Sequence, residues 1–179
     1  MIPKSRIIAL ASAGVLVLIA LLISYVRNKS VPSAYAPNVV RELGKAGSEH
    51  AHQSMLIFIN GKPLDFSQSR YQVKSELFHF EDGDGVYIHK HAVGVTLPLF
   101  LETLNIKLTT NCLRLDTGLE YCSDETGTLS TYLNNKLYTK WNRYELKQDD
   151  KILIDYSKGS TPNDIKLRMN AIPDIPSDL

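Results

Sequence analysis

The histidines of this 179-residue chain all fall in one stretch: His50, His52, His79, His89 and His91. Four of them form two pairs with a single residue between the histidines, and each pair lies in a segment typical of a β-strand. Residues two apart in a strand point to the same face of a sheet, so each pair would present two imidazoles side by side. If these segments are neighbours in one sheet, their imidazoles converge as a transition metal requires.

The clustering predicts a copper or zinc site whose ligands are His50, His52, His89 and His91. His79 would be a fifth ligand, or would hold the ligands in place. Nearby carboxylates could complete the coordination or orient the imidazoles: Glu49, Glu81, Asp82 and Asp84. Because the cluster contains no thiolate or thioether, Cu(II) or Zn is favoured over Cu(I).

Other interpretations of the histidines stay open. They could be polar strand positions without a ligand, or a protein-contact or pH-responsive patch. A metal-dependent hydrolase or hydratase is a further alternative, with Glu49 or Glu81 as the base. However, no nucleophile motif, phosphate-binding loop or cofactor fingerprint accompanies the histidines, so an enzyme is not favoured. The acidic loop at residues 82–85 lacks the further oxygen ligands of an EF-hand, so calcium is not favoured either.

The first 30 residues differ from the rest of the chain. Ile7 to Val26 carries no charge and is rich in Ile, Leu, Val and Ala, and about 20 such residues cross a bilayer as a helix. A small-x-small cleavage site is absent at the end of this run, so we expect a retained anchor rather than a removed signal peptide. The net charge of +1 gives no indication of nucleic-acid binding.

The two cysteines indicate the compartment. A three-residue turn at residues 116–118, with glycine last, predicts a hairpin in which Leu115 faces Leu119. The same register places Cys112 opposite Cys122, where a disulfide can form; two buried thiols are the alternative. Disulfides persist outside the cytosol. We therefore expect a single-pass cell-membrane protein with its amino terminus inside and its folded domain extracytoplasmic.

The sequence predicts an α+β fold: an N-terminal transmembrane helix, then a mainly antiparallel, β-grasp-like domain with one central amphipathic helix. The expected segments are a cytoplasmic stub and anchor (1–30), a stalk (31–48), the β-rich domain (49–160), and a C-terminal helix and tail (161–179). Within the domain, Asn60-Gly61 and residues 81–85 mark hairpins, and a helix begins at Thr96. Short strands are expected near residues 71–73 and 144–146, and residues 173–179 are expected to fray.

Two resemblances accompany these patterns. The Asn60-Gly61 turn, the helix opening at Thr96-Leu97 and the closing Tyr-x-Leu-x-x-Asp-Asp-x-Ile-x-Ile-x-Tyr at residues 144–156 resemble the β-grasp plan of ubiquitin-like and sulfur-carrier proteins. The glycine-glycine terminus of the sulfur carriers is absent, so their activity is not implied.

The run Phe-His-Phe-x-Asp-Gly-Asp-Gly-x-x-Ile-His-x-His-Ala at residues 78–92, with the earlier histidine pair and the two cysteines, resembles membrane-anchored extracytoplasmic proteins of ammonia-oxidising archaea. The resemblance covers about residues 49–156. Members often carry the label protein-disulfide isomerase, which implies thiol exchange. That chemistry uses a Cys-x-x-Cys pair at a helix start, whereas Cys112 and Cys122 have nine residues between them in sequence and lie on expected strands.

Taken together, these patterns favour a membrane-anchored extracytoplasmic metal-binding protein that holds copper or zinc. Its partners would be the lipid bilayer, through residues 7–26, and a membrane or envelope protein. The alternatives are a structural or interaction subunit of a membrane complex without a functional metal, and a thiol-disulfide oxidoreductase.

Overall fold

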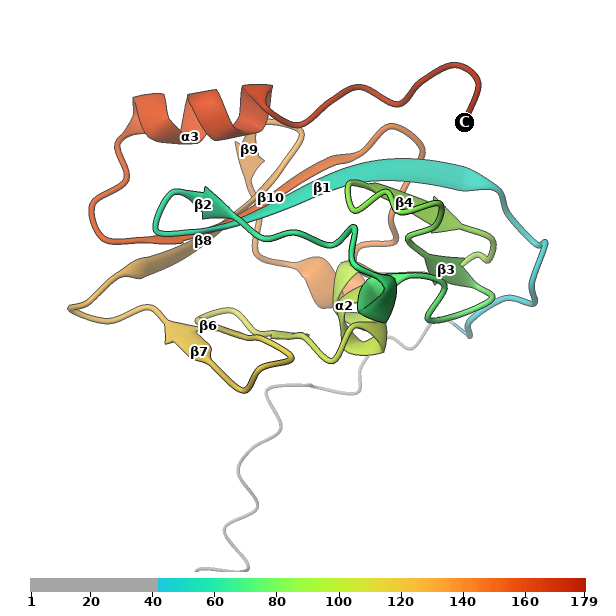
Figure 1. Cartoon of the computed structure of the whole chain (residues 1–179), viewed down its shortest axis with the longest axis horizontal. Coiled ribbons are helices and arrows are strands. Elements are labelled where there is room, and N and C mark those ends of the chain that lie inside the picture. Colours follow the sequence, from blue (N-terminus) through green and yellow to red (C-terminus); the bar gives the residue numbers. More distant parts are fainter. Residues whose placement is uncertain (1–41) are drawn as a thin grey trace, which may run out of the picture. The chain divides into compact units, whose positions relative to one another are not determined.

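The computed structural model describes residues 42–179, which form an α+β domain with mostly antiparallel strands (Figure 1). The predicted membrane span at residues 7–26 lies outside the described residues, as does most of the predicted stalk. Between residues 42 and 179, no helix has both the length and the apolar character that crossing a bilayer requires.

Strand β1 (Ala51–Ile59) is the centre of a seven-stranded sheet with the order β3-β4-β1-β10-β8-β9, and β2 also pairs with β1. Its first residues pair antiparallel with β4, and its later residues pair parallel with β10. A smaller sheet has the order β5-β6-β7. The other strands of the large sheet are β2 (Lys62–Pro63), β3 (Phe78–His79), β4 (Tyr87–Lys90), β8 (Thr128–Leu133), β9 (Lys136–Leu137) and β10 (Lys151–Ser157). Those of the small sheet are β5 (Lys107–Leu108), β6 (Cys112–Arg114) and β7 (Glu120–Cys122).

The Asn60-Gly61 turn joins β1 to β2 as predicted. Both residues have positive φ, +49° and +78°, which is the backbone of the tight turn that matches the twist of a two-stranded hairpin. The second predicted hairpin also forms, because the loop at residues 81–85 joins β3 to β4.

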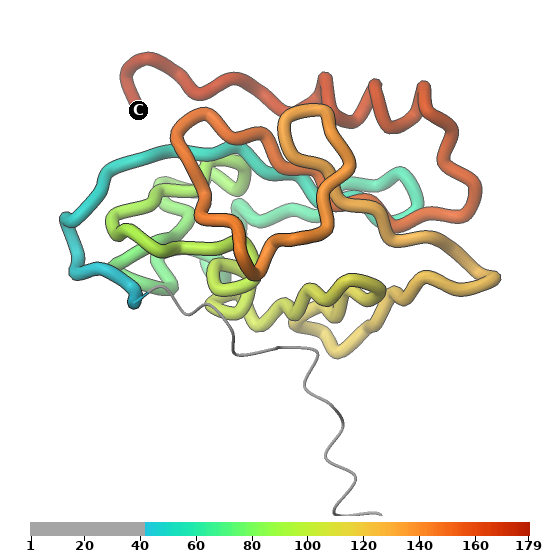
Figure 2. Tube along the Cα trace, turned by 180° about the vertical axis from the view of Figure 1, so that it is seen from behind, coloured from blue at the N-terminus to red at the C-terminus, as the bar shows by residue number. Residues whose placement is uncertain are grey.

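The two faces of the large sheet are covered by different helices. Helix α2 (Leu97–Thr103) lies on one side and α3 (Pro162–Asn170) on the other, and Figures 1 and 2 show the same layers from opposite sides. On the α2 side, the alternate residues Met55 and Ile57 of β1 enter the main core. On the α3 side, Phe58 packs in a smaller cluster with Leu153, Met169 and Ile172. Thus β1 is buried on both faces.

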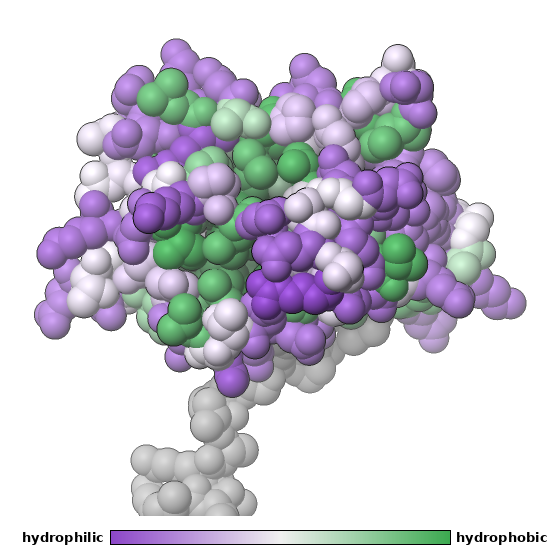
Figure 3. Space-filling model, in the orientation of Figure 1, coloured by the Kyte–Doolittle hydropathy of each residue, from purple (hydrophilic) through white to green (hydrophobic). Residues whose placement is uncertain are grey.

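Apolar side chains also reach the surface. On the face shown in Figure 3 they form a band between two polar regions. The large apolar residues most exposed among those described are Val73, Leu119, Leu137 and Leu167.

The carboxy-terminal segment is better ordered than the sequence predicts. Thr161 and Asp164 form a capping box at the start of α3. The prediction that residues 173–179 fray is wrong at their beginning. The Ser54 hydroxyl donates to the Pro173 carbonyl at 2.8 Å, and the Tyr87 hydroxyl donates to the Asp174 carbonyl at 3.2 Å. Side chains of β1 and β4 therefore hold the first residues after α3 on the sheet.

Three local expectations also differ from the structure. Residues 71–73 are not a strand, because a 3-10 helix spans Ser69–Tyr71; a second one spans Trp141–Arg143. Residues 144–146 contribute only an isolated bridge between Thr96 and Glu145. The backbone of Gly44 donates to the Val93 carbonyl at 3.0 Å, so the end of the predicted stalk already contacts the domain.

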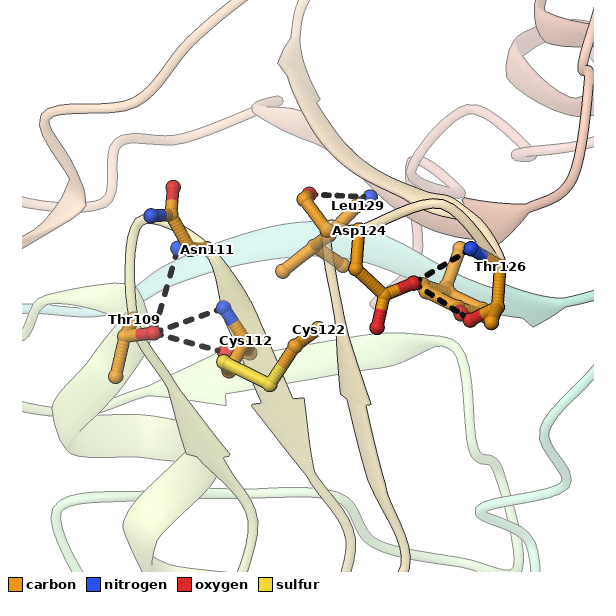
Figure 4. Close-up of a disulfide and its surroundings, with 9 residues drawn as sticks. Thr109, Asn111, Cys112, Cys122, Asp124, Thr126 and Leu129 are labelled. Atoms are coloured by element: carbon orange, nitrogen blue, oxygen red, sulfur yellow. Dashed lines mark hydrogen bonds between the residues drawn. A yellow bond between two sulfur atoms is a disulfide. The ribbon is translucent and has the colours of Figure 1, made fainter.

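The cysteines form the predicted disulfide across the β6-β7 hairpin (Figure 4). Cys112 pairs directly with Cys122 in the strand register. In the turn, the Leu115 amide donates to the Leu119 carbonyl at 2.8 Å, and Gly118 has a φ of +85°. The turn and register predicted from the sequence are confirmed.

We expect the double variant Cys112→Ala/Cys122→Ala to have a free energy of unfolding lower by about 2–3 kcal/mol, because the disulfide restrains a short loop in the unfolded chain. Guanidinium denaturation measures this change. Leu119→Ala, an exposed change in the same hairpin, is the control and should alter stability by less than about 0.5 kcal/mol. Equal stabilities of the double variant and the unaltered protein would contradict the expectation.

Candidate metal centre

Strands β1, β4 and β3 place three histidines in one row across the sheet. His52 lies opposite His89, and His89 lies opposite His79. Directly opposed residues on neighbouring strands point to the same face. The predicted convergence of the imidazoles required that the histidine segments be neighbouring strands of one sheet. The pairing of β1 with β4 and of β4 with β3 meets this requirement.

With the remaining two histidines, each of the five imidazoles lies next to two others, so the side chains form a closed circle. His50 precedes β1 and His91 follows β4. Between successive ring centroids the distances are 4.7 Å (His50 to His52), 4.7 Å (His52 to His89), 6.1 Å (His89 to His79), 5.1 Å (His79 to His91) and 5.2 Å (His91 to His50). We call these five side chains the imidazole cluster. All five predicted histidine ligands therefore lie together.

The imidazole cluster is buried at one end and open at the other. His52, His79 and His89 are between 4% and 6% exposed, whereas His91 is half-buried and His50 is exposed. An ion held by the inner histidines would thus be shielded, with access from the side of His50.

Glu81 is the carboxylate that contacts the imidazole cluster. Its Oε2 lies 3.0 Å from Nε2 of His79, and its Oε1 lies 3.0 Å from Nδ1 of His89. The two oxygens therefore contact two different imidazoles. This places one of the four predicted carboxylates within the cluster.

The other three predicted carboxylates do not contact the imidazole cluster: two bind other groups, and one is exposed in a turn. The Glu49 carboxylate lies 2.6 Å from the Lys90 ammonium. Oδ1 of Asp84 accepts hydrogen bonds from the backbone amides of Val86 at 2.6 Å and Tyr87 at 2.7 Å, which shapes the start of β4. Asp82 is an exposed turn residue with a φ of +56°.

A hydrogen bond fixes which nitrogen of His79 faces the cluster. Its Nδ1 lies 2.6 Å from the Ser75 carbonyl oxygen. A carbonyl can only accept, so Nδ1 must carry a proton, and Nε2 is the nitrogen directed toward Glu81. Histidines that bind metals usually donate their other ring N–H to a carbonyl or carboxylate in this way.

The surroundings keep several imidazoles neutral. Burial, followed by the neighbouring imidazoles, lowers the pKa of His52 below its usual range. Burial likewise lowers the pKa of His91, and it lowers that of His89 although the Glu81 charge opposes the change. For Glu81, burial acts to raise the pKa, but the hydrogen bond from His79 and the nearby imidazoles outweigh it and lower the pKa. Neutral imidazoles beside an ionised carboxylate are a donor set for a divalent cation.

In the structure, no three donor atoms of the imidazole cluster are close enough together to bind a single ion. Within residues 42–179, the metal-type side chains whose donor atoms all lie within 4.8 Å of one another are Cys112, Glu120 and Cys122. Their sulfurs are joined in the disulfide, so no thiolate is available there. In the imidazole cluster, rotation of the outer rings would be needed to bring three donors onto one ion.

A buried lysine supports the imidazole cluster from the opposite face of the sheet. Lys90 lies between His89 and His91 in sequence, and its side chain is completely buried. Its ammonium lies 2.6 Å from Glu49, 3.3 Å from Glu145 and 2.7 Å from the Leu146 carbonyl. Sequence reasoning missed this role, although the alternation of faces in the strand already directs the residue between two histidines toward the core.

We expect the metal-free protein to lose stability as the pH falls from about 7 to 5.5. The unfolded chain takes up protons at its histidines near pH 6.5, while His52, His89 and His91 take them up only at lower pH in the folded protein. The unfolded state therefore binds more protons in this window, and stability falls by up to about 1.4 kcal/mol per pH unit for each such histidine. Denaturant unfolding at several pH values measures the slope.

The control for this slope is His52→Gln, which removes one of the titrating groups. Its stability should fall less steeply over the same window. Stability that stayed constant, or rose, as the pH fell would show that the buried imidazoles are not held neutral.

We expect Lys90→Met to lower the free energy of unfolding by about 3 kcal/mol, because it leaves the Glu49 and Glu145 carboxylates without the buried ammonium. Lys62→Met, at an exposed position of β2, is the matched control and should cost less than about 0.5 kcal/mol. Thermal or denaturant unfolding compares the two. Equal effects would mean that the buried ion pairs do not secure the sheet.

Comparison of the chain with protein families, with curated proteins and with solved structures found no match.

Proposed function

We propose that this protein is a membrane-anchored, extracytoplasmic protein that binds copper or zinc through its imidazole cluster. The observation that carries the proposal is the row of His52, His89 and His79 across three adjacent strands, with the Glu81 carboxylate between the last two. Scattered surface histidines would have no reason to gather from three segments of the chain onto one patch of the sheet.

The chemistry of the donors supports a divalent transition metal. Imidazole nitrogens with one carboxylate suit Zn and Cu(II), and thioether or thiolate ligands that would favour Cu(I) are not among the cluster residues. The lowered pKa values of His52, His89 and His91 keep their lone pairs available near neutral pH. The inner imidazoles shield the ion, and exposed His50 gives it a route in and out. These features suit a protein that binds and releases metal.

Two features support the cellular location: the apolar segment at residues 7–26 and the Cys112–Cys122 disulfide. Residues 7–26 would anchor the chain in the membrane with its amino terminus inside. The Cys112–Cys122 disulfide supports a folded domain outside the cytosol. Held there, the domain would act beside a membrane or envelope protein that supplies or receives the metal.

We also propose that the domain is a member of the β-grasp folds. Its strands β2, β1, β10, β8 and β9 follow one another in the sheet in that order, with α2 against one face. A parallel pair of first and last strands flanked by hairpins is the plan that the sequence resemblance implies. We likewise propose that the chain is related to the membrane-anchored extracytoplasmic proteins of ammonia-oxidising archaea, which its histidine run resembles.

Titration of the full-length protein in detergent with Cu(II) and with Zn(II) tests the metal proposal. We expect at least one of these ions to bind with a Kd below micromolar. His89→Gln should weaken binding at least about tenfold, or about 1.4 kcal/mol, because it removes an inner ligand. Ser54→Ala is the matched control: it lies on the same face of β1 but contacts the carboxy-terminal segment, so it should leave the affinity unchanged. Binding of both ions weaker than micromolar would refute the proposal.

A further inference from the structure

The two oxygens of Glu81 contact two different imidazoles. Metal–nitrogen and metal–oxygen bonds of about 2.0–2.2 Å place neighbouring ligands of one tetrahedral ion about 3.3–3.6 Å apart. Oε2 of Glu81 lies 3.0 Å from Nε2 of His79, and Oε1 lies 3.0 Å from Nδ1 of His89. Each oxygen thus contacts a different imidazole at hydrogen-bonding distance, and a small outward movement would give each pair the separation of two adjacent ligands. Because each imidazole contacts a different oxygen of Glu81, one metal ion could bind beside His79 and a second beside His89.

The ring distances divide the other imidazoles between these positions. Two imidazoles on one tetrahedral ion have their centroids about 5 Å apart. His91 lies 5.1 Å from His79, and His52 lies 4.7 Å from His89. By contrast, His89 lies 6.1 Å from His79 and 6.4 Å from His91. The cluster therefore separates into His79 with His91, and His89 with His52.

The fifth histidine can serve either position. His50 lies 4.7 Å from His52 and 5.2 Å from His91, at the exposed end of the cluster. Five imidazoles and two carboxylate oxygens are more donors than one four-coordinate ion takes, and they leave a position open when two ions share them.

From this geometry, and resting on the proposed function, we infer that the imidazole cluster binds two divalent ions bridged by Glu81. One ion is held by His79, His91 and Oε2 of Glu81, and the other by His89, His52 and Oε1. A bridging carboxylate sets two ions about 3.5–4 Å apart. Since one carboxylate supplies the negative charge that contacts both ions, the second ion binds more weakly than the first.

The order of filling follows from burial. His52 and His89 are both buried, whereas the other position includes half-buried His91. Rotation of His52 brings the third donor to the inner position, and rotation of His91 and His50 toward Glu81 and His79 then completes the second. Exchange with solvent or with a partner protein takes place at this outer ion.

Titration of the full-length protein in detergent with copper(II) chloride tests the inference, with elemental analysis after removal of free metal and with electron paramagnetic resonance. We expect two copper ions per chain. The resonance signal should grow up to one equivalent and then fall by at least half, because the second ion couples magnetically to the first through Glu81. The copper stoichiometry and the resonance signal of the unaltered protein therefore test the inference without any variant.

Two variants locate the bridge. Glu81→Gln should bind one copper ion per chain with a full resonance signal, because the amide does not bridge two ions as a carboxylate does. Asp82→Asn, an equal change of charge at the next, exposed residue, should keep two coupled ions. A single ion in the unaltered protein, two uncoupled ions, or coupling that survives Glu81→Gln would overturn the inference while leaving metal binding intact. No bound copper or zinc would instead refute the proposed function.

Discussion

The antiparallel pairing of β1 with β4 is the constraint on which the imidazole cluster depends. Side chains alternate between the faces of a strand, so a shift of one residue would turn a histidine pair to the opposite face. The Lys90 ammonium opposes such a shift, because it is buried against Glu49 at the start of β1 and against Glu145 and Leu146 beyond the sheet. An ammonium moved from this position would remain buried without its partners. The charged contact on one face therefore fixes the imidazoles on the other.

The central position of β1 joins the site to the rest of the fold. Its second half lies between β10 and the β2 hairpin, and its apolar residues are buried on both faces. Its first half pairs with β4 and has His52 and Ser54 on the α3 side. The Ser54 hydroxyl binds the segment that follows α3, so this segment borders the imidazole cluster. One strand thus carries both the apolar contacts that stabilise the domain and His52 of the imidazole cluster.

Local sequence patterns predicted the elements well but could not predict all of their partners. The turn at Asn60-Gly61, the helix from Thr96, the C-terminal helix and the register of Cys112 with Cys122 depend on residues close in sequence, and each is confirmed. The pairing of His79 with His89 depends on how the segment between β3 and β4 closes, which the sequence spacing alone left open. The contacts of Lys90 and Pro173 join distant segments, so they follow from tertiary packing and have no local signal.

The burial of neutral imidazoles is itself an argument for a ligand. A polar ring removed from water costs free energy unless its nitrogens are hydrogen-bonded or coordinated. An apolar residue at the positions of His52 and His89 would fill the same space, and it would avoid the proton uptake that destabilises the fold in mild acid. Natural folds keep such unfavourable groups mainly where they have a function. Coordination by a metal would offset the loss of hydration and replace the protons that the buried rings exclude, so the electrostatics that weaken the metal-free fold would favour metal binding.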